Sequence, residues 1–454
     1  MSSPRFAAAL LAGKFCAKLC AAFFPKRGSN LPGEIALKLD PLFLRHITGV
    51  DTAKTIFITG TNGKSTANNM VVHAFRSAGR SVASNLEGAN MKPGAAAALL
   101  KNTTAGGRFK KEYLILEVDE RSLALIAKDL PPGQLCVANI QKDQVQRNGD
   151  PDYIYEKIKA VVRSAKNLTL FVNNDEPRSK SLGGQAAKGG RVVSFGVSAN
   201  ARASQIETDY GVTMPCPVCR DALVFTHFNI AGVGAFRCPS CGFRSDETPD
   251  YRIDKADFEN GTFTALGETC RLAYPAAFFL YNYALCAAVC AENGMAAAEL
   301  KSAFGTFANI GGRMEAFSCR GKTVRYMRIK QENPETLQSA LDTMAEDKTE
   351  KVLVVGPAVV DDIVPHYSNT FYTFDCNFEP FAASGVERCI CFGSTIGWDM
   401  ANRLRYAGIP DEKIEIVGTD DDEKILAAIA ACRSGNVYLI TWIKKYEKLK
   451  GYAG

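Results

Sequence analysis

The stretch Thr59-Gly-Thr-Asn-Gly-Lys-Ser-Thr66 constrains the fold more than any other part of the chain. It follows an apolar, β-branched run at 54–59 and precedes a segment, 65–78, in which the apolar residues have helical spacing. A glycine-rich turn between a buried strand and a helix directs backbone N–H groups and the helix N-terminus at phosphate oxygens. The stretch therefore predicts a phosphate-binding loop within a doubly wound α/β sheet.

The residue types in this loop fit ATP and Mg²⁺. Glycines let the backbone approach the phosphates, Lys64 supplies a positive charge to the β/γ-phosphates, and the Ser65 hydroxyl can bind Mg²⁺. The general G-x-x-x-x-G-K-[ST] pattern has Gly where Ile58 stands, so the loop is a variant. We predict that the nucleotide contacts come from the loop residues Gly60, Thr61, Asn62, Gly63, Lys64, Ser65 and Thr66.

Further strand-like runs alternate with helical ones, at 81–84, 113–118, 135–140, 169–173 and 191–195. Such alternation predicts a mostly parallel sheet with its ligand site beyond the carboxyl ends of the strands. Glu117 ends one of these strands and is the predicted Mg²⁺ ligand, with Glu120 as second choice. The alternative is an acidic strand end that is merely solvated.

Four cysteines form a C-x₂-C pair followed by a second C-x₂-C pair within a turn-rich segment, 208–252. This spacing predicts a closed tetrahedral Zn²⁺ site with a structural role, and it is favoured over incidental thiols or a redox pair. The predicted ligands are Cys216, Cys219, Cys238 and Cys241. The remaining cysteines are scattered through apolar segments, which indicates free thiols and a reducing cytoplasm.

The N-terminal segment 6–24 is rich in Ala, Leu, Phe and Cys, but Lys14 and Lys18 interrupt it. A spanning helix and a secretory signal both fit poorly, so the segment predicts an amphipathic helix packed on the protein, with a membrane-surface position as the alternative. We expect a cytoplasmic protein that can contact the inner face of the membrane. A formal charge of +6 spread over 454 residues gives no support for nucleic-acid binding.

The order of these patterns predicts three parts. Residues 1–53 form an N-terminal helix and connector, residues 54–317 form the ATP-binding central domain with the four-Cys insertion, and residues 318–454 form a second α/β domain. The last part shows its own alternation of strands and helices, which begins after Gly321.

Several stretches besides the loop share their pattern with one enzyme family. They are Leu31–Leu39, Asn85–Met91, Leu116–Glu120, the four-Cys insert, Gly312–Glu315 and Asp399–Gly408. Together they resemble the Mur ligase family, in its MurT branch, over nearly the whole chain. The resemblance implies an α/β protein with a Mur ligase-type P-loop central domain, whose sheet is doubly wound and mostly parallel, a four-Cys zinc-ribbon insertion and a C-terminal α/β domain.

The resemblance also implies roles for particular residues. Asn173, Asp175 and Arg313 would bind the nucleotide, beside Lys64 as a catalytic group and Glu117 as a catalytic metal ligand. An Asp that the branch tends to carry near the partner's glutaminase site is replaced by Asn369, and Asp375 can compensate for it. Both are therefore candidate catalytic residues.

The activity implied by the resemblance is an ATP-dependent carbon–nitrogen ligase of peptidoglycan synthesis. It would amidate the D-glutamate α-carboxyl of lipid II, or a related cell-wall precursor, to D-isoglutamine through an acyl phosphate. Ammonia would come from a GatD-like glutamine amidotransferase subunit in a heterodimer. Two alternatives remain: an amino-acid ligase of the Mur or folylpolyglutamate synthase type, and a non-catalytic ATP-binding zinc scaffold.

Overall fold

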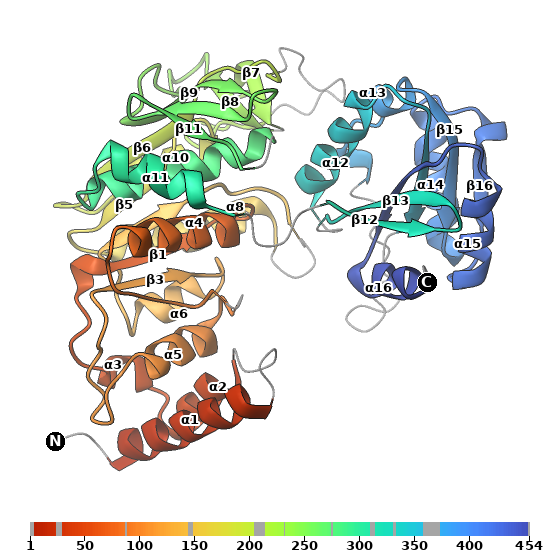
Figure 1. The fold of residues 1–454 in the computed structure, drawn as a ribbon. Helices are drawn as coiled ribbons and strands as arrows, with labels where there is room; N and C mark the ends of the chain where they lie inside the picture. Colours follow the sequence, from red (N-terminus) through yellow and green to blue (C-terminus); the bar gives the residue numbers. More distant parts are fainter. Residues whose placement is uncertain are drawn as a thin grey trace. The chain divides into compact units, whose positions relative to one another are not determined.

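A computed structural model describes residues 4–23, 30–86, 89–143, 149–203, 214–230, 232–273, 276–308, 314–329, 333–356 and 373–452 (Figure 1). The chain forms two compact units. The first contains Met1–Gln141, Asn148–Glu207 and Gly211–Asn309, and the second contains Lys142–Arg147, Thr208–Tyr210 and Ile310–Gly454. The predicted boundaries at residues 53 and 317 stay predictions.

The first unit is built on a nine-stranded sheet in the order β11-β10-β9-β6-β5-β4-β1-β3-β2. Along this order, neighbouring strands pair in parallel from β2 through β3, β1, β4, β5 and β6 to β9. The pairs β9 with β10 and β10 with β11 are antiparallel. The bounds are β1 (Thr55–Thr59), β2 (Val82–Ser84), β3 (Tyr113–Glu117), β4 (Gln134–Val137), β5 (Thr169–Asn173), β6 (Arg191–Val197), β9 (Tyr251–Asp257), β10 (Thr262–Ala265) and β11 (Glu268–Arg271).

Helices cover both faces of this sheet because its central strands are apolar on both sides (Figure 1). Ile56 and Ile58 pack in the core with α4 (Lys64–Ser77), α10 (Ala277–Glu292) and α11 (Ala297–Thr306). Phe57 points to the opposite core, built with the helices α5 (Lys92–Lys101), α6 (Leu123–Ala127) and α8 (Pro151–Ser164). The predicted doubly wound arrangement is confirmed.

Three N-terminal helices pack against α5: α1 (Pro4–Phe23), α2 (Leu31–Leu39) and α3 (Phe43–His46). The buried residues of α1 include Phe6, Ala9 and Leu10, so the predicted helix does pack on the protein. Within the described residues, α1 is the one helix that is long and apolar enough to cross a membrane, judged by length and composition. Shorter elements of the first unit are η1 (Thr52–Lys54), α9 (Pro177–Ser181) and η2 (Leu182–Gln185).

The four-Cys insertion forms a separate hairpin, β7 (Val224–Ile230) and β8 (Val233–Arg237), paired antiparallel. Its own core is small: Leu223 and Phe236 pack with Cys216 and Cys238. A core of this size is too small to hold the hairpin together unaided, which agrees with a metal-stabilised insertion.

The second unit is a six-stranded sheet in the order β12-β13-β17-β14-β15-β16, with cores on both faces. All pairs are parallel except β12 with β13. The strands are β12 (Met314–Cys319), β13 (Lys322–Met327), β14 (Lys351–Gly356), β15 (Val386–Phe392), β16 (Ile414–Val417) and β17 (Asn436–Thr441). The helices are α12 (Pro334–Glu346), α13 (Glu379–Ala382), α14 (Ser394–Tyr406), η4 (Asp411–Lys413), α15 (Asp422–Ala431) and α16 (Ile443–Gly451).

Candidate functional site

The turn between β1 and α4 has no room for side chains at its two glycines. Gly60 has φ of 133° and Gly63 has φ of 82°, values in the region that favours glycine. A Cβ atom on Gly60 would lie 2.9 Å from the backbone nitrogen and oxygen of Asn139. On Gly63 it would lie 2.5 Å from Oδ1 of Asn282. The sequence pattern therefore reflects a real steric requirement.

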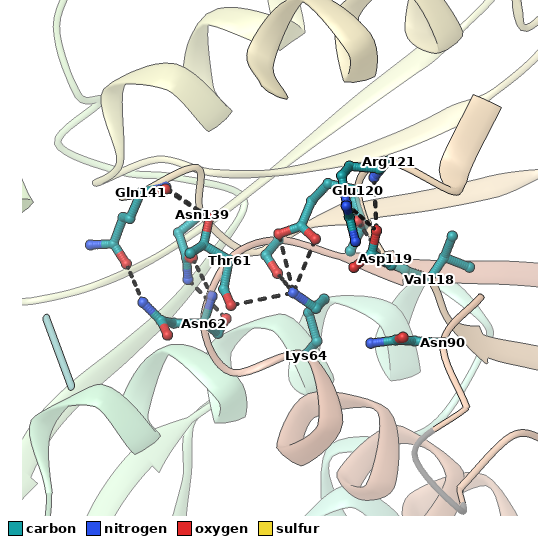
Figure 2. A network of polar contacts seen from close by, with 12 residues as sticks. Thr61, Asn62, Lys64, Asn90, Val118, Asp119, Glu120, Arg121, Asn139 and Gln141 are labelled. Carbon is teal, nitrogen blue, oxygen red and sulfur yellow. Dashed lines mark hydrogen bonds and ion pairs between the residues drawn. The ribbon is translucent and has the colours of Figure 1, made fainter. Parts of the chain in front are cut away.

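The loop is tied to the residues that follow β4. Thr61 N–H donates to the Asn139 carbonyl at 3.0 Å, and Asn62 N–H donates to Asn139 Oδ1 at 2.8 Å. Asn139 Nδ2 returns a bond to the Asn62 carbonyl at 3.0 Å, while Asn62 Nδ2 donates to Gln141 Oε1 at 3.0 Å (Figure 2). Two neighbouring strand ends thus hold the loop in one conformation.

Lys64 is buried at the first position of α4, with 8% of its surface exposed. Its Nζ donates to Glu120 Oε1 and Oε2 at 3.1 and 3.2 Å, to the Thr61 carbonyl at 3.3 Å, and to the Gly60 carbonyl. Figure 2 shows the ammonium group between Glu120 and the loop. Lys64 is therefore paired with Glu120, which the sequence analysis gave as the second choice, after Glu117, for a Mg²⁺ ligand. Which of the two carboxylates binds Mg²⁺ stays a prediction.

Glu117 is the buried last residue of β3 and is held by two asparagines. Asn85 accepts from the Glu117 N–H at 2.9 Å and donates to its carbonyl at 2.8 Å. Asn90 Nδ2 donates to Glu117 Oε1 at 3.1 Å. Both asparagines lie within the stretch Asn85–Met91, whose pattern was noted in the sequence, but their role as partners of Glu117 was missed.

Ser65 is exposed and Thr66 is half-buried on the first turn of α4. Both residues therefore lie next to Lys64 on the helix end that faces the loop. Their predicted contacts with Mg²⁺ and phosphate stay predictions.

Asn173 and Asp175, at the end of β5, are engaged by the protein itself. Asn173 Nδ2 donates to the Ala138 carbonyl at 2.9 Å and its Oδ1 accepts from Asp175 N–H at 3.1 Å. Asp175 Oδ2 accepts from Val197 N–H at 2.8 Å and from Tyr281 Oη at 3.0 Å. Burial raises the pKa of Asp175, and these donors oppose that rise. The pair fastens strand ends together, and its predicted contact with the nucleotide stays a prediction.

Asn282, on α10, is a site residue that the sequence analysis missed. Its side chain is 4% exposed and touches Gly63, and its Nδ2 has no hydrogen-bond partner among the described residues. A buried donor without a partner commonly marks a place for a ligand. Together with the glycine cradle and the buried ammonium of Lys64, it fits a phosphorylated nucleotide. An amide within an otherwise apolar helix was the available sequence signal.

The four predicted zinc ligands come together in the hairpin insertion, with all four Sγ atoms within 4.8 Å of one another. Cys216 and Cys241 Sγ are 3.7 Å apart, and Cys219 and Cys238 Sγ are 3.4 Å apart. Four Zn–S bonds of tetrahedral geometry place sulfur atoms about 3.8 Å apart. Val218 N–H also donates to Cys216 Sγ at 3.4 Å. The cluster fits a tetrahedral metal, and its identity as zinc stays a prediction.

The predicted residues of the C-terminal part are only partly visible. Asn369 and Arg313 lie outside the described residues. Asp375 Oδ2 pairs with Lys142 Nζ at 2.7 Å, and each side chain is 36% exposed. Burial, together with the negative charges of Asp143 and Asp375, raises the pKa of nearby Glu335 to about 8. Among the described residues, Glu335 Oε2 has no hydrogen-bond partner.

Two protein families match the chain: the Mur ligase middle domain over residues 58–232 and the MurT ligase C-terminal domain over residues 331–443. The MurT subunit of lipid II isoglutaminyl synthase (glutamine-hydrolyzing) from Staphylococcus aureus strain COL is 27% identical over 385 residues, covering 85% of this chain and 84% of the relative. The MurT subunit from Streptococcus pneumoniae strain R6 is 26% identical over 419 residues, covering 91% and 90%.

Solved structures share the fold. A pseudomurein peptide ligase type C from Methanothermus fervidus has a TM-score of 0.62 at 16% identity, covering 89% of this chain and 78% of that one. MurF ligase from Thermotoga maritima in complex with ADP has a TM-score of 0.57 at 15% identity, covering 92% and 83%. The chain therefore contains a Mur ligase middle domain and a MurT ligase C-terminal domain. It is a homologue of MurT subunits over most of its length, which confirms the resemblance drawn from the sequence.

The cysteine cluster predicts a measurable metal content. We expect about one zinc ion per chain by elemental analysis, and Cys238→Ser should remove most of it because three thiolates leave the coordination shell open. Cys16→Ser, at a half-buried thiol of α1, is the matched control and should keep its zinc. Unchanged zinc in the Cys238 variant would contradict the assignment.

Glu335 predicts a pH dependence of the second unit's stability. Its pKa is higher in the folded chain, about 8 against 4.5, so the folded form binds more protons between these values and stability falls as pH rises through that window. The slope from this group reaches at most about 1.4 kcal/mol per pH unit. Glu335→Gln should flatten the fall in thermal unfolding experiments, whereas Glu412→Gln, at an exposed carboxylate, should not. Equal slopes in the parent and the Glu335 variant would refute this assignment.

Proposed function

We propose that this chain is the ATP-dependent ligase subunit of an enzyme that amidates the D-glutamate α-carboxyl of lipid II to D-isoglutamine. The observation that carries the proposal is the buried Lys64 in a glycine cradle at the end of β1. Glu120 is paired with Lys64, and Glu117 ends the neighbouring strand β3. Family membership supports an ATP-dependent ligase of peptidoglycan synthesis. The names of the MurT relatives support the choice of lipid II and of glutamine as the nitrogen source.

The chemistry requires an activated acid, because a carboxylate resists attack by ammonia. Transfer of the γ-phosphoryl group to a carboxylate oxygen gives an acyl phosphate and ADP. Ammonia then attacks the carbonyl carbon, the C–O bond to phosphate breaks, and the nitrogen loses a proton to give the amide. Phosphoryl transfer needs mainly positioning and charge neutralisation, so it does not depend on a histidine base.

The site residues divide these tasks. Lys64 neutralises phosphate charge, and the backbone N–H groups around Gly63 hold the phosphates. Ser65 and Glu117 would hold Mg²⁺, which supplies further charge neutralisation when bound. Asn90 keeps the Glu117 carboxylate oriented. These roles form part of the proposal.

A partner subunit completes the proposed enzyme. The relatives are named as subunits of a glutamine-hydrolyzing synthase, which supports a separate GatD-like subunit as the ammonia source. We propose that Asp375 and Asn369 act together with that subunit, as the family resemblance implies. The half-exposed Asp375, held by Lys142, has a carboxylate accessible to a partner.

The purified chain with its neighbouring amidotransferase, ATP, Mg²⁺, lipid II and glutamine or ammonium should yield an amide product, identified by its mass. Lys64→Ala should lower the rate by about 10²-fold or more with either nitrogen source, because transition-state charge loses its partner. The zinc content and thermal unfolding should stay unchanged. Lys159→Ala, at a lysine paired with Glu156, is the control and should keep full activity.

Other outcomes of that assay would replace the proposal. Phosphate release stimulated by an amino acid rather than by ammonia would indicate an amino-acid ligase. Bound nucleotide without phosphate release under any acceptor would indicate a scaffold. A Lys64→Ala variant with normal turnover would remove the loop from the mechanism.

Replacing Asp375 should affect glutamine-dependent and ammonium-dependent amidation differently. If its carboxylate serves the glutaminase site of the partner, Asp375→Asn should lower glutamine-dependent amidation about 10²-fold while leaving ammonium-dependent amidation nearly unchanged. Asp411→Asn is the control, because it removes a different surface carboxylate, one paired with Arg405, and it should change neither rate. An equal loss with both nitrogen sources would instead place Asp375 in the ligase reaction or in folding.

A further inference from the structure

One face of α1 presents large apolar side chains to solvent. Leu11, Phe15, Leu19 and Phe23 are 66%, 65%, 42% and 70% exposed. Their four-residue spacing places them along one side of the helix. Soluble proteins seldom leave a continuous apolar stripe of this kind uncovered, and such stripes mark interaction surfaces.

The opposite face of α1 is fixed to the protein. Phe6 and Leu10 are buried, and a Cβ atom on Gly13 would lie 2.4 Å from Cδ1 of Leu100, so the helix backbone lies close to α5. Lys14 Nζ donates to the carbonyls of Leu100 and Thr103 at 3.1 and 2.7 Å. A spanning orientation would break these contacts, because lipid would then surround the helix. The helix can instead remain packed while its outer face enters an interface.

The charge around α1 is strongly positive. The first fifty residues contain seven Lys or Arg and two Asp or Glu, which accounts for five of the six net charges of the chain. Arg5 and Lys18 are exposed on α1 itself, and Lys110 lies close enough to Lys14 to act on it electrostatically. An apolar stripe bordered by cations complements a bilayer surface that carries anionic headgroups.

We propose that α1 docks in the plane of an anionic lipid surface, with Leu11, Phe15, Leu19 and Phe23 at the acyl boundary. Lys18 and Arg5 contact headgroups, their stems lying along the apolar stripe. The evidence for this docking surface comes from α1 alone and does not depend on the proposed enzymatic function. It bears on catalysis only if the proposed function holds, since a lipid-linked substrate would then be present in the same membrane.

The full chain should sediment with vesicles of phosphatidylglycerol and phosphatidylcholine, and much less with pure phosphatidylcholine vesicles. Added salt should weaken the binding, because part of the attraction is electrostatic. The double variant Leu11→Glu/Phe15→Glu should bind at least tenfold more weakly. Leu125→Glu, at a 60% exposed leucine of α6, is the matched control and should bind like the parent.

A second measurement tests the proposal if the double variant Leu11→Glu/Phe15→Glu is less stable than the parent. Phe15→Trp keeps the stripe apolar and should shift its fluorescence to shorter wavelength on anionic vesicles, measured as a difference from the parent with its two native tryptophans. The proposal would be overturned if Phe15→Trp shows no fluorescence shift or if the parent does not sediment with anionic vesicles. It would also be overturned if the folded double variant sediments as much as the parent. A parent dimer that Phe15→Glu dissociates would show that a second copy covers the stripe, and this also overturns it.

A lipid-free stem-peptide substrate distinguishes this proposal from the proposed function. The folded double variant should amidate that soluble substrate at the parent's rate while it fails to bind vesicles. Vesicle binding without turnover on any substrate would leave the docking surface in place and remove the amidation.

Discussion

The lack of space around the turn after β1 is the constraint on which the site depends. Gly60 lies against the backbone of Asn139, and Gly63 lies against the side chain of Asn282, so any side chain would push the turn away from β4 and α10. The strand that precedes the turn is buried on both faces at the centre of the sheet. A rigid strand and a crowded turn together keep the backbone donors and Lys64 in place before any ligand arrives, which is the preorganisation that phosphoryl transfer needs.

The same crowding creates a low-dielectric region that contains several charges. Lys64, Glu117 and Glu120 are each less than a tenth exposed, and each has polar partners within the protein. Charges in such a place interact more strongly than they do at a surface. Asn282 Nδ2, a buried donor without a described partner, lies where the loop turns into α4. The geometry thus agrees with the Mur ligase domains that the chain contains.

Features with local signatures were predictable from the sequence, and those set by distant contacts were not. The loop, the β5 strand at 169–173 and the four-Cys cluster follow from nearby spacing, and the structure contains them all. The pairing of Lys64 with Glu120 depends on how the chain turns after β3, and periodicity does not record that. Asn282 comes from a helix remote in sequence. The antiparallel edge of β9, β10 and β11 was missed because the predicted alternation stopped at the insertion.

The ion pair between Lys64 and Glu120 has a consequence for how either side chain can be displaced. An anion that attracts Lys64 away would leave the 8% exposed Glu120 carboxylate without its cation, and an uncompensated buried charge is strongly disfavoured. A positive charge beside Glu120 would compensate for that loss. The pair therefore couples the two side chains, because displacing one of them carries an electrostatic cost at the other.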